Sequence, residues 1–146
     1  MFSKSGAVAT ASEWRGGRVA EWGDIQTYMR STYRLQDDDP DMMSVVWAYE
    51  DGRSQRVFVR RYRADDHDMV EVKSPFARVG EVDAEVLLRE NSQMTLATIA
   101  QSGQVYLAIY NLLLSATTVD DFDFVLKRVA STADALEEKY ASADEF

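Results

Sequence analysis

The sequence has no cysteine, two prolines and a single histidine. Without cysteine the chain can form no disulfide, no thiolate metal site and no thiol nucleophile. A cysteine-free chain suits a reducing compartment, so we expect the protein to be cytoplasmic. Histidine is the usual proton shuttle near neutral pH, and a chain with only one offers little material for acid-base catalysis.

Long apolar runs are missing too. No stretch approaches the roughly 18 consecutive apolar residues that a membrane-spanning helix needs. The first twenty residues include Lys4, Glu13, Arg15 and Arg18, a pattern that does not suit a secretory signal. With 16 Lys and Arg against 25 Asp and Glu, the net charge is −9, which repels nucleic-acid phosphates and anionic lipid surfaces. We therefore expect no membrane partner.

The remaining composition is that of a globular protein. The chain has 146 residues, of which 46% are hydrophobic, and this is enough to bury one core. Residues 1–17 are rich in Ser, Gly, Ala and Thr and lack periodicity, so they are predicted to form a flexible leader. Residues 18–141 are predicted to form a single domain, and residues 142–146 a frayed tail.

The first half of the chain predicts one helix followed by three strands. Apolar residues recur every three or four positions from Arg18 to Tyr33, which indicates an amphipathic helix. The acidic run at residues 37–41 is predicted to be a solvated loop. Residues 42–50 and 55–63 then flank Asp51-Gly52, a dipeptide typical of a tight hairpin turn.

A third strand is predicted at residues 69–78, where Pro75 indicates either an edge position or a bulge. Residues 81–92 predict a short helix with Asp83 as a possible cap. A second hairpin follows, with strands at 94–100 and 104–110, and the leucines at 112–114 continue it as a buried run.

The last element is a long helix that begins near Thr118. Thr118 and Asp121 have the spacing of a capping box. After them apolar residues recur at helical spacing and form a stripe. We expect this stripe to cover the sheet as part of the core, although its spacing would also suit packing against a helix of a second copy in a dimer. Its members are Val119, Phe122, Leu126, Val129, Ala133, Leu136 and Tyr140.

These elements predict the fold class. Two hairpins exclude a purely parallel, doubly wound sheet, because parallel neighbours need long crossovers. We expect an α+β fold in which helices pack on an antiparallel sheet of about five to six strands, in the order α-β-β-β-α-β-β(-β)-α.

Catalytic and metal-binding signals are weak. His67 lies among Asp65, Asp66 and Asp68 in a predicted surface turn. The acidic run at 37–41 imitates a calcium loop, but Met42 stands where an EF-hand needs glycine. The sequence has no phosphate-binding glycine loop and no nucleophile elbow. We predict that the protein is not an enzyme and has no catalytic residue, metal or cofactor.

The most basic segment runs from Arg53 to Arg63 and is interleaved with Phe58 and Tyr62. Such a mixture of cations and aromatic rings suits single-stranded nucleic acid. The surrounding acidic residues favour internal ion pairs instead. A third possibility is a protein-binding face, because arginine and aromatic residues are enriched at interface hot spots.

The last third of the chain resembles a known family. Leu87-Leu88-x-x-Asn91 ends a predicted helix, Gly103 centres a hairpin, and Leu114, Phe122 and Leu126 anchor an apolar strand and a closing helix. In this layout, over about residues 18–140, the chain is similar to the YbjN and type III secretion chaperone-like domains of bacteria. The resemblance implies a small acidic, non-catalytic protein, usually a homodimer, that binds polypeptide segments through apolar patches.

Our leading hypothesis is therefore a cytoplasmic, chaperone-like or regulatory protein-binding module that masks an apolar segment of a client polypeptide. The candidate binding residues are Trp47, Tyr49, Phe58, Arg60 and Tyr62. Their hairpin could add an extended client strand if its edge is free. The alternative is binding of RNA or single-stranded nucleic acid through Arg53 to Arg63. The client protein and a second copy of the chain are the expected partners.

Overall fold

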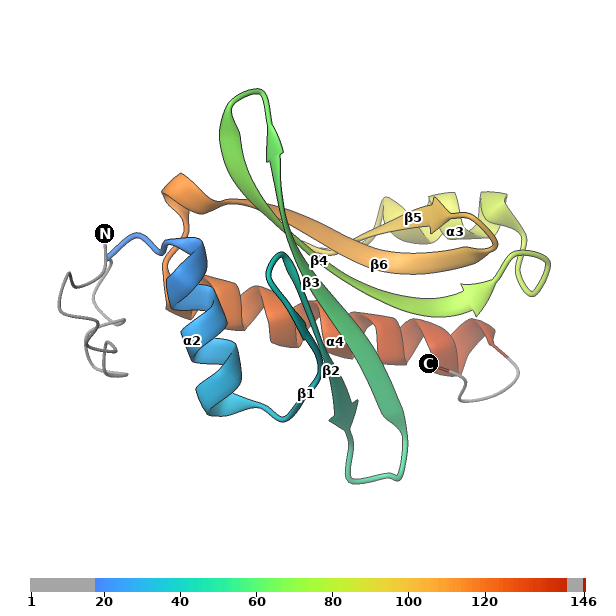
Figure 1. Ribbon diagram of the computed structural model, residues 1–146. Helices are drawn as coiled ribbons and strands as arrows, with labels where there is room; N and C mark the ends of the chain where they lie inside the picture. The colour runs from blue at the N-terminus through green and yellow to red at the C-terminus, as the bar shows by residue number, and fades with distance from the viewer. Residues whose placement is uncertain (1–17, 142–145) are drawn as a thin grey trace, which may run out of the picture.

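The computed structural model describes residues 18–141 and residue 146 (Figure 1). The predicted leader at 1–17 and residues 142–145 of the predicted tail lie outside the described residues. The elements follow one another as α2 (Trp22–Thr32), β1 (Leu35–Asp39), β2 (Met42–Ala48), β3 (Ser54–Ala64), β4 (His67–Arg78), α3 (Ala84–Asn91), β5 (Thr98–Ser102), β6 (Val105–Leu113), a short 3-10 turn η1 (Leu114–Ala116) and α4 (Val119–Tyr140).

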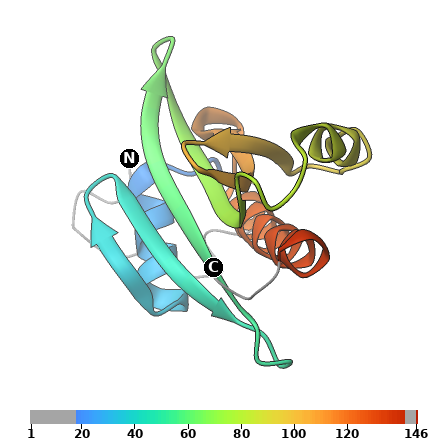
Figure 2. The same ribbon diagram turned by 90° about the vertical axis from the view of Figure 1, so that its right-hand side faces the viewer.

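The predicted α+β class is confirmed. Six strands form one sheet in the order β1-β2-β3-β4-β6-β5, and every neighbouring pair is antiparallel. The helices α2, α3 and α4 complete the fold, and the sheet is strongly twisted (Figure 2). Among the described helices, none is long and apolar enough to cross a membrane.

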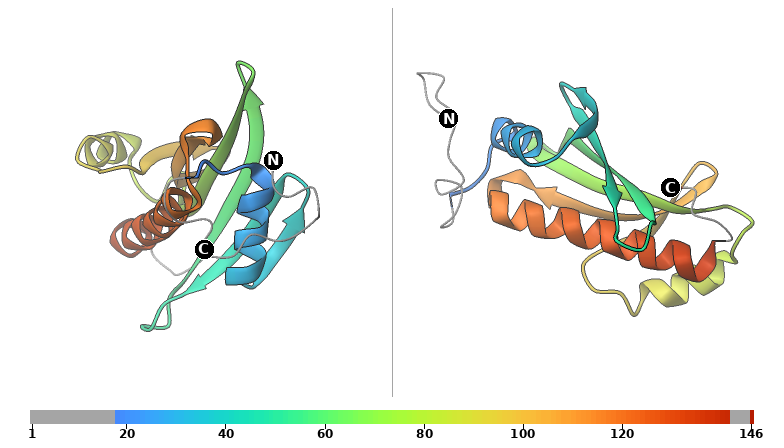
Figure 3. Two further views of the ribbon diagram at one scale, coloured as in Figure 1. Left: turned by 90° about the vertical axis from the view of Figure 1, so that its left-hand side faces the viewer. Right: turned by 90° about the horizontal axis from the view of Figure 1, so that it is seen from below.

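One face of the sheet carries the core. Successive strand residues point to opposite faces, so the valines at 57, 59, 70 and 72 bury their side chains on the helix-covered face. The long helix α4 lies against this face. Helix α2 lies near the N-terminal end of α4, and α3 lies near the C-terminal end of α4 (Figure 3). The apolar stripe predicted for α4 packs into this core, which confirms its assignment.

The acidic run is the largest departure from the predicted layout. Residues 37–39 were expected in a loop, and this prediction is wrong, because they belong to edge strand β1 and pair with β2. Cations offset the carboxylates: Arg30 lies 2.8 Å from Asp38 and Arg56 lies 2.6 Å from Asp37. The turn of this hairpin is shorter than expected and consists of Pro40 and Asp41.

Pro75 lies in a central strand. The register between β4 and β6 shifts between Pro75 and Ala77, so the predicted bulge is confirmed and the alternative of an edge position is wrong. A bulge tolerates proline because it locally releases the ladder from its hydrogen bonds. The pairing of β4 with β3 ends close to this bulge. The last pair is Phe58 with Lys73, so residues 54–57 of β3 and residues 74–78 of β4 do not pair with each other.

Cap chemistry follows the prediction, whereas several boundaries do not. Asp83 accepts a hydrogen bond from the backbone of Glu85, and Thr118 and Asp121 form a reciprocal capping box. The first helix begins at Trp22 rather than at Arg18. The strand expected at 94–100 is β5 at 98–102, and β6 extends to Leu113.

Candidate functional site

The five predicted binding residues do not form one surface. Trp47 is on the helix-covered face of β2, where its Cα partner on β3 is Gln55. Phe58 and Arg60 on β3 point to the opposite, uncovered face, as does Tyr62. The alternation of the strands therefore separates Trp47 and Tyr49 from the other three candidates.

Trp47 and Tyr49 lie close to α4. The Trp47 ring centroid is 5.2 Å from that of Tyr33, and Trp47 packs against the core. The Tyr49 hydroxyl is buried and has no hydrogen-bond partner among the described residues, and burial raises its pKa to about 12. Both rings line a hollow of about 370 Å³ beside Phe124, so half-exposed aromatic surface is concentrated there.

The remaining candidates are engaged within the sheet. Arg60 lies 4.7 Å above the Tyr62 ring and 3.3 Å from Glu71. The Tyr62 hydroxyl donates a 2.8 Å hydrogen bond to Asn111. Phe58 is covered in part by the Arg56 guanidinium, 5.0 Å from its ring. These contacts leave little unsatisfied chemistry on this face for a partner.

The expectation that the arginine segment pairs internally is confirmed. Arg53 lies 2.9 Å from Asp134, Arg61 lies 3.3 Å from Asp68, and Arg63 lies 3.1 Å from the same carboxylate. Arg56 and Arg60 are paired as described above. Each of the five guanidinium groups thus has a carboxylate partner, which reduces the positive field that phosphates would meet.

The first hairpin lies inside the sheet over most of its length. β2 pairs with β3 along its whole length and with β1 over residues 42–45, and β3 pairs with β4 from Phe58 onward. The condition set for strand addition there, a free edge along the hairpin, is therefore not met. The two edges of the sheet are β1, which carries three aspartates, and β5, whose five residues Thr-Ile-Ala-Gln-Ser are uncharged.

The uncharged edge borders an apolar groove between β5 and α3. The groove has a volume of about 230 Å³. Leu87 is buried beneath it, and Leu88 on the same helix is 68% exposed. The lining residues are Ala84, Leu87, Leu88, Asn91, Ile99, Ala100, Gln101 and Tyr106. We call this combination of open edge and apolar hollow the β5–α3 groove.

Along β5 the backbone N–H and C=O groups of successive residues point alternately towards β6 and away from the sheet. Ser102 and Val105 flank a two-residue turn, so the pairing with β6 uses the backbone groups of Ser102, Ala100 and Thr98. The groups of Ile99 and Gln101 consequently point outward. At Ile99 the outward position is filled by Asn91, whose side-chain oxygen accepts a 2.8 Å hydrogen bond from the Ile99 N–H.

The groove residues were only partly visible in the sequence. Leu87, Leu88 and Asn91 were noted for the family resemblance but not as binding residues. Ile99 was placed in a predicted strand and Gln101 in the predicted turn after it, whereas both belong to β5. One usable signal was present: the strand at 98–102 contains no charge in a chain where 28% of residues are charged. Charged residues commonly protect edge strands from pairing with other chains. Once β5 is known to be an edge, its lack of charge therefore indicates that it can accept another strand.

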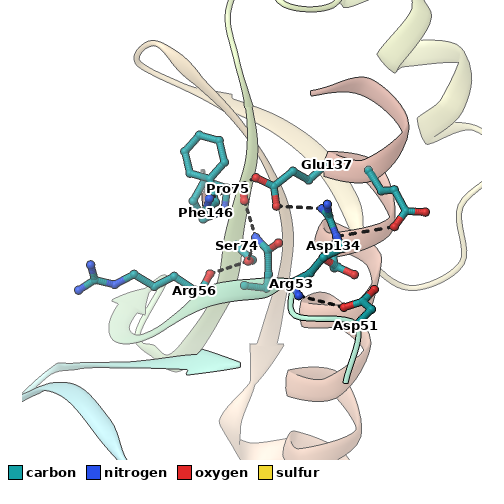
Figure 4. Close-up of polar contacts among 10 residues, drawn as sticks. Asp51, Arg53, Arg56, Ser74, Pro75, Asp134, Glu137 and Phe146 are labelled. Atoms are coloured by element: carbon teal, nitrogen blue, oxygen red, sulfur yellow. Dashed lines mark hydrogen bonds and ion pairs between the residues drawn. The ribbon is translucent and has the colours of Figure 1, made fainter. Parts of the chain in front are cut away.

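A polar cluster fills the space where β3 and β4 diverge (Figure 4). The Gln55 amide donates hydrogen bonds to the Ser74 hydroxyl at 2.8 Å and to the Pro75 carbonyl at 2.6 Å. Glu137 on α4 is 1% exposed and lies 3.3 Å from Arg53. These contacts replace the missing ladder, and we assign the cluster a structural role.

Phe146 completes this cluster. Its carbonyl oxygen accepts a 3.0 Å hydrogen bond from the Arg56 N–H, and its ring lies 5.6 Å below the Arg78 guanidinium. Phe146 was part of the predicted frayed tail, and the structure instead places it against β3 and β4.

The acidic turn with His67 shows no catalytic arrangement. His67 is exposed at the first position of β4, directly after the turn at Asp65 and Asp66. Within residues 18–141 and 146, no group of three or more His, Asp or Glu side chains is arranged to hold a metal ion.

Comparison with known proteins adds no assignment. No model of a known protein family matches the chain, and no curated protein is significantly similar to it.

Proposed function

We propose that this protein is a non-catalytic, chaperone-like binding module that takes up an extended polypeptide segment along β5. The observation that carries the proposal is the contact between Asn91 and Ile99. There a side-chain amide, which offers the same C=O acceptor and N–H donor as a peptide bond, occupies an outer hydrogen-bonding position of the edge strand. A bound polypeptide would use the same position and continue at Gln101.

The groove supplies side-chain recognition beside the edge. When a strand is added to a sheet, main-chain hydrogen bonds provide affinity and alternate side chains enter neighbouring hollows. The hollow beside Leu87, Leu88 and Ile99 is apolar and suits an aliphatic or aromatic side chain. Binding would cover the exposed Leu88 and mask an apolar segment of the client.

The two edges of the sheet differ in a way that favours β5. A strand approaching β1 meets Asp37, Asp38 and Asp39, and two of these carboxylates already bind arginines. A strand approaching β5 meets no charge on that strand. Unpaired edges without charge are the ones that attract other chains.

The proposal agrees with what the family resemblance implies, namely binding of polypeptide segments through apolar patches. Nucleic-acid binding has less support, because each arginine from Arg53 to Arg63 is already within ion-pair distance of a carboxylate.

Two variants of one residue test the proposal. Gln101→Pro removes the outward N–H of Gln101 but keeps the pairing with β6, and proline is tolerated at the solvent side of an edge strand. Gln101→Ala is the matched control, because it removes the side chain and keeps the N–H. The probe is a phage-displayed library of random peptides about ten residues long, the upper length of a typical strand.

Peptides selected on the wild-type protein are expected to bind Gln101→Ala with unchanged affinity and Gln101→Pro at least roughly tenfold more weakly. They should also bind Leu88→Gln more weakly, since Leu88 borders the apolar hollow. Equal binding to Gln101→Pro and Gln101→Ala, or failure of the selection to yield any peptide, would overturn the proposal.

A further inference from the structure

The solvent side of α4 carries an unpartnered aromatic ring. The buried stripe of this helix faces the sheet, and Phe124 lies outside it. Phe124 is 58% exposed, and among the described residues it is the one aromatic side chain with the exposure of a surface residue. An isolated phenylalanine is compatible with a surface, so the residues around it decide its meaning.

Two unpaired charges lie one helical turn on either side of Phe124. Asp120 is four residues before it and Arg128 is four residues after it, so all three share one face of α4. Within residues 18–141 and 146, neither charge has an ion-pair partner, although neighbouring Lys127 pairs with Asp123 at 2.8 Å. Asp120 also interacts favourably with the helix N-terminus, whereas Arg128 in mid-helix gains nothing from the helix dipole.

This arrangement is complementary to itself. If two α4 helices pack antiparallel about a twofold axis through Phe124, the residue four positions after it faces the residue four positions before it in the other copy. Arg128 then meets Asp120 twice, and the two phenylalanine rings meet at the axis. A parallel pair would instead place like charges opposite each other.

The surface beside Phe124 has room for a second helix. On one flank lies the hollow of about 370 Å³ lined by Trp47 and Tyr49, and on the other a hollow of about 430 Å³ beside Leu112 and Val125. Phe124 forms the ridge between them. Packed helices have an axial separation of about 8–10 Å.

We propose that the protein forms a homodimer through this face of α4, with a second copy of the chain as the occupant. The contact places Phe124 at the twofold axis and pairs Asp120 of each copy with Arg128 of the other. It uses the solvent side of α4 and not the buried apolar stripe, and it includes no residue of the β5–α3 groove.

A mixing experiment tests the geometry of the pair. Alone, Arg128→Asp places two carboxylates at each contact, and Asp120→Arg places two guanidinium groups there. Each variant is expected to dimerise roughly tenfold more weakly than the wild type, because two exposed ion pairs become repulsive. An equal mixture of the two variants restores both pairs and should form a heterodimer with nearly wild-type affinity.

Sedimentation velocity over a concentration series measures these masses on the full chain. The wild type should approach twice 16.5 kDa, and Phe124→Ser should shift towards 16.5 kDa. Arg34→Asp is the matched control, because Arg34 is exposed, lies outside α4 and undergoes the same charge change. Thermal unfolding confirms that each variant is folded.

The proposal is overturned if the wild type remains at 16.5 kDa up to about 1 mM, the concentration at which even millimolar affinity is visible. It is also overturned if the wild-type dimer is unaffected by Phe124→Ser, or if the mixture of charge variants associates no better than either variant alone. A weakening by Arg34→Asp as large as that by Arg128→Asp would show that net charge and not the α4 contact is responsible.

Discussion

The side-chain oxygen of Asn91, the last residue of α3, lies 2.8 Å from the backbone nitrogen of Ile99 on β5. The same side chain approaches the Ile99 carbonyl at 3.5 Å through its nitrogen. One asparagine thus ties a helix to the outer edge of the sheet and satisfies backbone groups that would otherwise face solvent. It connects the two elements that form the proposed binding groove.

Removal of this side chain should loosen the edge. We expect Asn91→Ala to lower the free energy of unfolding by about 1 kcal/mol, since one net hydrogen bond is lost. The Ile99 amide proton should exchange faster with solvent, as measured by NMR hydrogen exchange. Asn91→Asp is the control, because it keeps the acceptor and should preserve that protection. Unchanged exchange in Asn91→Ala would contradict the assigned contact.

Asp123 should make the fold sensitive to acid. It accepts a 2.8 Å hydrogen bond from the Tyr33 hydroxyl and lies 2.8 Å from Lys127. Burial alone would raise the pKa of Asp123, but hydrogen bonds from Lys127, Tyr28 and Tyr33 outweigh it and hold the pKa below its ordinary value. A carboxyl with a lowered pKa stabilises the fold above its unfolded pKa of about 3.9. This contribution is lost as the pH falls through the lower folded value.

Urea unfolding across a pH series measures this effect. Asp123→Asn should be less stable than the wild type near neutral pH, by about 1–2 kcal/mol. The difference should shrink as the pH falls from about 5 to about 2, because the wild type loses the ionised carboxylate over that range. Parallel curves for the two proteins would contradict the role assigned to Asp123.

The buried Glu137 should make Arg53 important for stability. Arg53→Met removes the guanidinium that lies 3.3 Å from this carboxylate, which is 1% exposed. Loss of one partner of a buried pair costs about 3–5 kcal/mol, and we expect a decrease of that order in the free energy of unfolding. Arg63→Met is the control, because its partner Asp68 is partly exposed, and it should cost less than about 1 kcal/mol. Equal losses in the two variants would refute the distinction.

Two glycines should respond oppositely to alanine. Gly23 is the second residue of α2 and a Cβ there would meet no atom within 4 Å, so Gly23→Ala should stabilise the fold by about 0.5 kcal/mol. Gly52 has φ of +86° in the β2–β3 turn, and Gly52→Ala should destabilise it by about 1–2 kcal/mol. Thermal unfolding of both variants measures these changes, and a shift of the same sign in both would contradict the assigned conformations.

Features that depend on neighbouring residues were predictable from the sequence. The positive φ of Gly52, the bulge at Pro75 and the capping box of Thr118 and Asp121 arise from local backbone preferences, and all are present, although the turn at Asp51-Gly52 is part of a longer connection over residues 49–53. The apolar stripe of α4 follows helical periodicity and therefore identified its buried side. These patterns were also sufficient for the α+β class.

The edge strands could not be predicted in this way. Asp37 to Asp39 form a strand because β2 offers a ladder and Arg30 and Arg56 offset the charge, and both partners come from other elements. Likewise, β5 is an edge because β6 pairs with β4 on its other side. Strand order is a long-range property, so the first hairpin could be recognised locally while its place inside the sheet could not.

By itself, the sequence determined the three helices, five of the six strands, the buried side of α4 and the acidic character of the chain, because periodicity and composition act over a few residues. Only the tertiary structure decided which strand is open, that Trp47 and Tyr49 are separated from Phe58, Arg60 and Tyr62, and that Asn91 meets Ile99. These relationships depend on how distant segments pack, and that packing optimises the burial of the whole core and not the preference of any one segment.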